Sequence, residues 1–228
     1  MRRLGYLFVV LVLGLTLSAC KGSDSGSSGK SPQARLAAAK KTFDTADYIG
    51  FTLSTGDLPD GLQGLLSATG TGTHDPAFTG SVKVQTKVAD ITAPLVAVDS
   101  LVYAKLPFVG WNTIDPADYG APDPADLMDP AVGVSSLFTA TQSPTAGESQ
   151  RSGDQVLTTI DGTLPASAVK NVFPSAGTAD FSVSYTLTAD DAVDSATITG
   201  PFYAGSDDVT YTISFDLKAD KVAIQAPA

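Results

Sequence analysis

The stretches FSVSYTLT at residues 181–188 and VTYTISFDL at residues 209–217 decide the fold of this chain. In both, apolar residues at every second position alternate with serine, threonine or aspartate. Side chains of a strand point alternately to its two faces, so each stretch is a strand with one apolar and one wet face. Such strands are typical of an antiparallel sheet that packs one face against a core.

Further strands are predicted on both sides of these two. Val82, Val84 and Val88 alternate with polar residues, and 49–53, 95–98 and 101–106 are short apolar runs. Less regular strands are expected at 155–163, 193–199 and 221–225.

Helical spacing occurs in four places, one of them before the first strand. Ser31 and Pro32 are suited to the start of a helix whose apolar face runs from Leu36 to Ala46. Further helices are predicted at 123–141 and 165–173, and a short one at 59–67. We therefore expect an α+β fold, in which a single curved antiparallel sheet carries helices on its concave side. Periodicity alone does not tell whether the interior is a solid core or a void.

The N-terminus reads as a lipoprotein leader. Arg2 and Arg3 precede an apolar run from Leu4 to Leu15, too short to span a bilayer, and the run leads to Leu17-Ser18-Ala19-Cys20. A cysteine directly after small residues matches the lipobox, at which the thiol is acylated and the leader is cut. We expect a signal peptide at 1–19, lipidated Cys20 with a Gly/Ser tether to residue 31, and one domain at 32–228. The protein would be fixed to the extracytoplasmic face of the cell membrane by its acyl chains.

Charge and composition exclude several classes of protein. The net charge of −10 becomes −12 when Arg2 and Arg3 are removed, and so acidic a chain lacks the basic footprint that nucleic-acid binding needs. Cys20 is the only cysteine and His74 the only histidine. These counts leave no disulfide, no Ser–His–Asp or Cys–His catalysis and no histidine-based zinc site. We expect no catalytic residue, no metal and no cofactor.

Two further motifs are read as structural. His74-Asp75-Pro76 is predicted to be a turn. The acidic run from Asp115 to Asp129 lacks the glycine and the terminal glutamate of a calcium loop, and helix caps explain its aspartates better.

Several short sequence motifs in the chain resemble those of a known family. They include Gly80-Ser81-Val82-Lys83-Val84, Tyr103-Ala104-Lys105-Leu106, Trp111 with Asp115-Pro116, and Asp123-Pro124 with Leu127. Their order and spacing are similar, from about Pro32 to Pro227, to those of the LppX/LprA/LprF/LprG family of actinobacterial lipoproteins, and above all to its LprG-like members.

The resemblance implies a half-open barrel whose helices and sheet enclose an apolar cavity. It also implies a function, which is to bind long-chain acylated lipids or glycolipids and to carry them toward the outer cell envelope. The ligands it implies are triacylglycerol, phosphatidylinositol-mannosides or lipoarabinomannan. For LprG-like members it implies a major-facilitator efflux transporter as a partner. We expect the protein to be a monomer.

The same family pattern implies that Val82 faces the cavity, and the period of two adds Val84. Alternation along strands and the apolar faces of helices add further expected lining residues: Val96, Val98, Tyr103, Leu137, Phe138, Val169, Val172, Phe181 and Val183. For each of these the alternative is a position in an ordinary packed core. Trp111 is expected to be a loop aromatic or a residue at the cavity mouth.

Two other functions stay open at this point. One is a structural or adaptor lipoprotein that docks an envelope partner through its acidic surface and has a solid core. The other is a carboxylate-based hydrolase, for which no pair of acidic residues stands out.

Overall fold

The computed structural model describes residues 29–56, 58–119 and 121–228. The expected leader, Cys20 and most of the tether lie outside these described residues. All the elements given below belong to residues 29–228, so a chain of residues 21–228 contains the whole described fold. In the described part of the chain, no helix combines the length and the hydropathy needed to cross a membrane.

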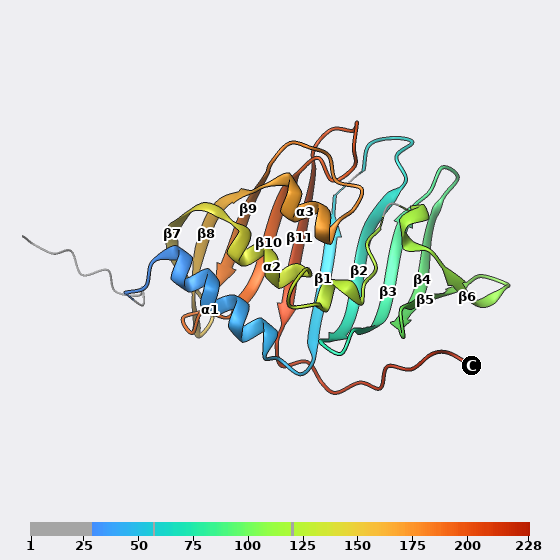
Figure 1. Cartoon of the computed structure of the whole chain (residues 1–228), viewed down its shortest axis with the longest axis horizontal. Coiled ribbons are helices and arrows are strands. Elements are labelled where there is room, and N and C mark those ends of the chain that lie inside the picture. Colours follow the sequence, from blue (N-terminus) through green and yellow to red (C-terminus); the bar gives the residue numbers. More distant parts are fainter. Residues whose placement is uncertain (1–28, 57, 120) are drawn as a thin grey trace, which may run out of the picture.

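One antiparallel sheet of 11 strands forms the frame of the molecule (Figure 1). Its strands are β1 (Ile49–Thr55), β2 (Gly64–Thr73), β3 (Ala77–Gln85), β4 (Asp90–Val98), β5 (Leu101–Leu106), β6 (Gly110–Ile114), β7 (Gln142–Ser152), β8 (Gln155–Leu164), β9 (Phe181–Leu187), β10 (Val193–Gly200) and β11 (Val209–Asp216). Their order across the sheet is β6-β5-β4-β3-β2-β1-β11-β10-β9-β8-β7.

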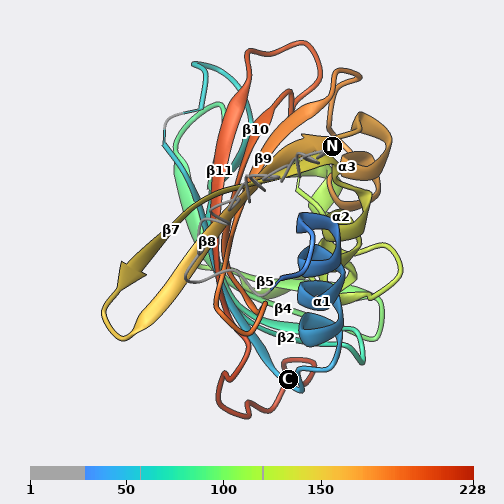
Figure 2. The same ribbon diagram turned by 90° about the vertical axis from the view of Figure 1, so that its left-hand side faces the viewer.

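The helices all lie on one side of this sheet. Figure 2 shows the sheet curling around them, so they occupy its concave face. They are α1 (Pro32–Asp44), α2 (Val134–Ala140) and α3 (Ala166–Val172), with two short 3₁₀ helices, η1 (Pro116–Tyr119) and η2 (Asp126–Met128). The expected α+β half-barrel is therefore confirmed.

The strand order dictates what covers the concave face. The sheet consists of two meanders, β1–β6 and β7–β11, joined where β1 pairs with β11. Strands β6 and β7 are adjacent in sequence but form opposite edges of the sheet. The chain between them, residues 115–141, must therefore cross the sheet, and it carries η1, η2 and α2 over the concave side.

The helices pack solidly on the half of the sheet formed by β7–β11. Phe43 of α1 meets Phe138 of α2 edge to face, with ring centroids 5.8 Å apart, and Phe138 meets Tyr185 of β9 at 5.3 Å. Phe173 after α3, Phe181 of β9 and the buried Phe202 after β10 form a second aromatic cluster. These T-shaped pairs fill the space between the layers.

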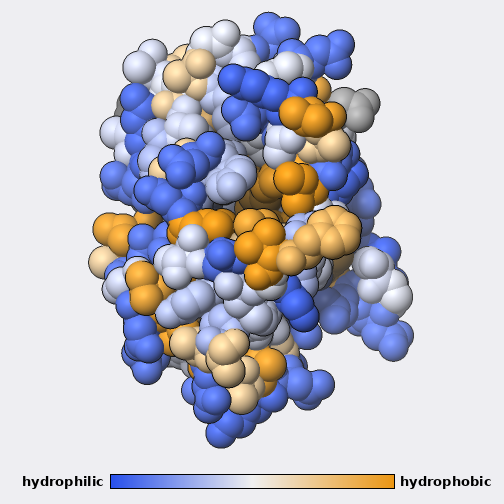
Figure 3. Space-filling view, turned by 90° about the vertical axis from the view of Figure 1, so that its right-hand side faces the viewer, coloured by the Kyte–Doolittle hydropathy of each residue, from blue (hydrophilic) through white to orange (hydrophobic). Residues whose placement is uncertain are grey.

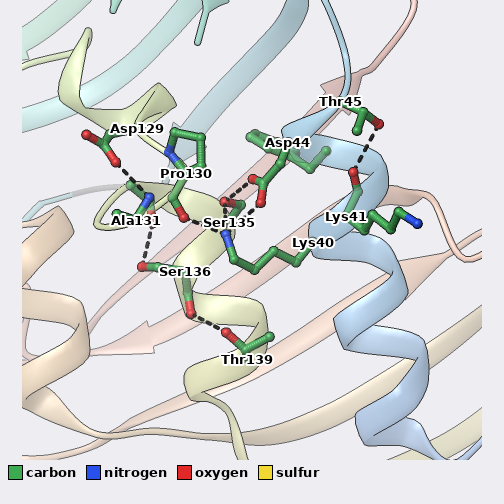
Figure 4. A network of polar contacts seen from close by, with 12 residues as sticks. Lys40, Lys41, Asp44, Thr45, Asp129, Pro130, Ala131, Ser135, Ser136 and Thr139 are labelled. Carbon is green, nitrogen blue, oxygen red and sulfur yellow. Dashed lines mark hydrogen bonds and ion pairs between the residues drawn. The ribbon is translucent and has the colours of Figure 1, made fainter.

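A polar network fixes α2 to α1 (Figure 4). The Lys40 ammonium lies 2.7 Å from Asp44 Oδ2 and 3.0 Å from Ser135 Oγ, and it also donates to the Pro130 carbonyl oxygen. The Ser135 hydroxyl donates to Asp44 Oδ1 at 2.6 Å. The network fixes the position of α2, whose residues reach the interior.

The first turn of α1 is held by an ion pair. Arg35 is almost fully buried and donates from Nε to Asp191 in the β9–β10 turn, and Lys30 Nζ lies 2.7 Å from the same carboxylate. Burial by itself would raise the pKa of Asp191, but the hydrogen bonds and charges of Lys30 and Arg35 hold it below its ordinary value. The site where the tether enters the domain is thereby fixed to the sheet.

Three predicted elements are wrong. Residues 59–67 are a loop followed by β2, because Gly61 has a positive φ of 77° that ends any helix there. Of the helix expected at 123–141, only η2 and α2 form, since Pro124 and Pro130 interrupt it. Residues 221–225 pair with no strand in the described chain. Strands β2, β6 and β7, which lack clean alternation, are not predicted from the sequence. Val88, expected to continue the strand of Val82 and Val84, lies instead in the turn after β3, which ends at Gln85.

Paired glycines let an aromatic ring lie flat on the sheet. Gly70 of β2 and Gly80 of β3 are opposite one another, and a Cβ on either would meet the ring of Phe78 and a backbone oxygen. The Phe78 ring in turn stacks on Phe51 with centroids 5.3 Å apart. Glycine is thus required here for close approach rather than for a turn.

Replacing Gly80 with alanine should destabilise the domain by about 2 kcal/mol, because the new methyl group meets backbone and Phe78, neither of which can yield freely. Urea unfolding followed by circular dichroism measures this. The control is Gly147→Ala, where a Cβ makes ordinary contacts at 3.4 Å or more. Equal stability of the two variants would contradict this role of the glycine pair.

Candidate lipid-binding cavity

The helices and the loop after β6 that lie over the concave face of the sheet are called the cover here. An apolar cavity lies between the sheet and this cover, on the side of β1–β6. Its walls come from alternate residues of β1–β6, β10 and β11, from the loop at 116–127, and from α2 and α3. Among the described residues that line it, none is charged, and the only side chains with a polar atom are those of Tyr119 and Tyr211. The cavity volume is about 140 Å³.

The cover over this half differs from the cover over the packed half. Loop residues Pro116, Tyr119, Pro122 and Pro124, not a long helix, close the cavity opposite β3–β6. Proline has no backbone N–H, so a proline-rich loop presents fewer unsatisfied donors to an apolar space. The loop covers the sheet without filling the space beneath it, which explains why a void remains here.

Five of the expected lining residues lie on the cavity wall. Val82 and Val84 face it from β3, Leu137 from α2, and Val169 and Val172 from α3.

Six of the expected lining residues lie elsewhere, for two reasons. Val96, Val98 and Tyr103 have the wrong parity: Val96 pairs with Tyr103 on the convex face, whereas Leu95 and Ala104, which pair with each other, line the cavity. Phe138, Phe181 and Val183 face the concave side, but they are buried in the solid half, where helices pack directly on β9.

Hairpin register is the signal that would have corrected the parity. Val82 is opposite Ala93, and Val84 is opposite Ile91, so these pairs share a face. Leu95 to Val98 is apolar on both faces, which is why alternation alone could not choose. The loop residues of the cover carried no periodic signal and were missed.

A closed ring of three hydrogen bonds keeps polar groups out of the cavity. Strand β2 has a bulge after Leu65, whose backbone groups turn toward buried Tyr203 and Tyr211. The Leu65 N–H donates to the Tyr203 hydroxyl at 2.8 Å, and the Tyr211 hydroxyl donates to the Leu65 carbonyl. Each phenol has one proton, so Tyr203 must donate to Tyr211, at 2.7 Å.

Both phenols of this ring stay neutral. Burial raises the pKa of Tyr203 and of Tyr211 above the ordinary value, and for Tyr211 the neighbouring Tyr203 raises it further. With its N–H and its carbonyl paired in this way, Leu65 adds no unsatisfied donor or acceptor to the apolar wall. The tyrosines therefore pair the Leu65 backbone groups without placing a charge at the apolar wall.

His74 joins the cover to the N-terminal helix. As expected it belongs to a turn, here between β2 and β3. Its Nδ1 lies 2.7 Å from the carbonyl oxygen of Met128 in η2, and its Nε2 lies 3.0 Å from that of Phe43 in α1. Trp111 lies on β6, opposite Lys105, and does not line the cavity. Within the described ranges, no group of three or more metal-ligating side chains comes together.

Comparison with known proteins agrees with this architecture. The family model described as "LppX_LprAFG lipoprotein" matches residues 31–220. The chain belongs to this family. A relative named lipoarabinomannan carrier protein LprG, from Mycobacterium tuberculosis (strain ATCC 25618 / H37Rv), is 28% identical over 178 residues, which cover 76% of this chain and 74% of the relative.

Two solved structures of family members share the fold. LprF from Mycobacterium bovis superposes with a TM-score of 0.70 at 15% identity, over 86% of this chain and 97% of that one. LppX from Mycobacterium tuberculosis superposes with a TM-score of 0.62 at 19% identity, over 85% and 98%. At these identities the likeness establishes the fold of the LppX_LprAFG lipoproteins and not the ligand.

Replacing both Tyr203 and Tyr211 with phenylalanine should lower stability by about 1–3 kcal/mol, because it leaves the Leu65 N–H and carbonyl unpaired in an apolar wall. Chemical denaturation measures the change. The matched control is Tyr119→Phe, in the loop of the cover. If the double variant is as stable as the control, water or other groups satisfy Leu65 and the ring is not what keeps the wall dry.

Proposed function

We propose that this protein is a membrane-anchored, non-catalytic carrier of long-chain acylated lipids. It takes lipid from the plasma membrane into the cavity and carries it toward the outer cell envelope. The observation that supports this most is the uncharged, almost wholly apolar lining of a cavity that the fold leaves open between sheet and cover. An empty cavity of this character is dry and favours apolar ligands.

The energetics of transfer explain why such a cavity suffices. Each methylene costs about 0.8 kcal/mol to expose to water, so a lipid with about forty to fifty methylenes costs on the order of 30–40 kcal/mol. Transfer from bilayer to cavity exchanges one apolar environment for another and needs no nucleotide.

The size of the cavity requires that its cover move. A cavity measured in this way needs at least roughly 10–15 Å³ to hold one water-sized group. The cavity of about 140 Å³ therefore admits on the order of ten methylene-sized groups. A lipid with two or three acyl chains exceeds that several-fold. We infer that the described loop residues 116–119 and 121–127, whose only helices are the short η1 and the start of η2, move away from β3–β6 when lipid enters.

The proposed cargo and partners extend the carrier function, and the name of one relative supports the cargo. Because one relative is named a lipoarabinomannan carrier, we propose triacylated glycolipids of the phosphatidylinositol-mannoside or lipoarabinomannan type, or triacylglycerol, as cargo. A major-facilitator efflux transporter is the proposed partner in the cell membrane. The lipobox cysteine, Cys20, is proposed as the lipidated anchor on the extracytoplasmic face.

Val82→Trp tests the cavity, because its indole would occupy the space next to β3. If it displaces only two methylenes, lipid affinity falls by roughly tenfold. Native mass spectrometry of the purified protein measures the bound fraction. The control is Tyr103→Trp, which adds an indole on the convex face. Equal lipid loading of Val82→Trp, Tyr103→Trp and the unmodified protein would refute the cavity as the binding site.

Cys20→Ala tests the anchor separately. Because Cys20 precedes the described fold, purified Cys20→Ala protein should bind lipid as the unmodified protein does, whereas lipid delivery in cells should fail. Surface glycolipid is measured by labelling of intact cells, and binding by native mass spectrometry. Loss of binding in vitro would show that the acyl anchor contributes to the site, contrary to this account.

A further inference from the structure

Two turns beside the cavity expose large apolar side chains. Val88, in the β3–β4 turn, is 95% exposed; in the β5–β6 turn Phe108 is fully exposed and Val109 is 68% exposed. Strand β4 runs antiparallel to both β3 and β5, so the two turns lie at the same end of the strands. Exposure of valine and phenylalanine side chains to water at these turns is unfavourable.

The backbone at Phe108 adds a second cost. Phe108 has a φ of 65°, in the left-handed region that glycine and asparagine adopt most easily. Gly110 in the same turn has a φ of 84°, so the chain uses glycine where the backbone needs it. A bulky aromatic side chain at a strained, fully exposed position is therefore unfavourable for folding, which points to a use outside the domain.

The turns continue the wall of the cavity. Leu106 lines the cavity and ends β5 two residues before Phe108. Val84 and Ile91, which flank the other turn, also line it. Figure 3 shows apolar side chains gathered across the middle of the face at this side of the molecule, around a recess. An apolar path thus leads from the turn tips into the interior.

Charged and aromatic residues border the tips. Lys87 and Lys105 are exposed beside them, and Trp111 pairs with Lys105 across β5 and β6. The acidic residue nearest the β3–β4 turn, Asp90 at the start of β4, forms an ion pair with Lys83 at 2.9 Å. An apolar tip bordered by lysine and tryptophan is the arrangement found at membrane–water interfaces, where these side chains reach the headgroup layer.

We propose that the β3–β4 and β5–β6 turns insert into the lipid bilayer and bring the cavity against it. This inference rests on the proposed carrier function and adds the surface through which lipid enters. The proposed binding partner of these turns is a bilayer surface. Their apolar residues project at two turn tips, and apolar side chains connect these tips with the cavity. Loaded in this way, an acyl chain would pass from the bilayer along β3–β5 without crossing water.

A vesicle-binding assay tests the surface. Residues 21–228, purified without the leader and the acylated cysteine, are mixed with neutral phosphatidylcholine vesicles and sedimented. The test variant is Phe108→Asn with Val109→Thr, which also relieves the backbone at residue 108. The control is Leu101→Thr, which removes a 44% exposed leucine from the opposite end of β5. We expect partitioning to fall by about tenfold or more in the test variant and to stay unchanged in the control.

A second readout separates this proposal from the carrier function. Binding of a fluorescent fatty acid added from solution reports the cavity alone, and it should be equal in all three proteins. Thermal unfolding should show the test variant at least as stable as the unmodified domain. The bilayer proposal is overturned if the test variant binds vesicles as the unmodified domain does, or if the unmodified domain binds none. In either case, fatty-acid binding would still support the carrier function. Absence of fatty-acid binding in every protein overturns the carrier function itself.

Discussion

Everything in this fold depends on the crossing that its strand order imposes. The sheet is made of two meanders whose last and first strands, β6 and β7, form opposite edges. One segment, residues 115–141, must therefore span the concave face. The apolar side of an 11-stranded curved sheet needs cover along its whole width, and this crossing, with α1 and α3, is what the chain supplies. The cover and the cavity are two results of the same connection.

The cover packs more tightly on one half of the sheet than on the other, and the two halves have different roles. Over β7–β11 the helices pack against the sheet through Phe43, Phe138 and Tyr185, which gives the domain a solid core. Over β1–β6 the crossing is a proline-rich loop with short 3₁₀ helices, and an apolar cavity lies beneath it. Even the bulge at Leu65 has its backbone groups paired by Tyr203 and Tyr211, so the wall stays apolar. One half holds the fold, and the other is free to receive a ligand.

Local pattern in the sequence predicted most of the sheet but only part of the site. Strands with strict alternation, such as β9 and β11, were placed to within one or two residues, because one wet face makes the period visible. Alternation places Val96 on the wrong face because Leu95 to Val98 is apolar throughout, and Tyr103 shares that error because it pairs with Val96. The register of the strands, not their period, decides which residues face the cavity there. The loop residues of the cover, such as Pro116 and Tyr119, have no period, so only the tertiary crossing reveals them. The cavity itself was implied by family resemblance and not by pattern.

The central claim is that the interior holds acylated lipid. The most direct measurement is native mass spectrometry of residues 21–228 purified from an actinobacterial host, followed by identification of any released molecule. The account predicts a population of protein heavier by one acylated lipid or glycolipid, which is released as a long-chain species when the protein is denatured. Protein that carries no lipid from such a host, and that takes up none from vesicles, would contradict it and would favour an adaptor with an unused interior.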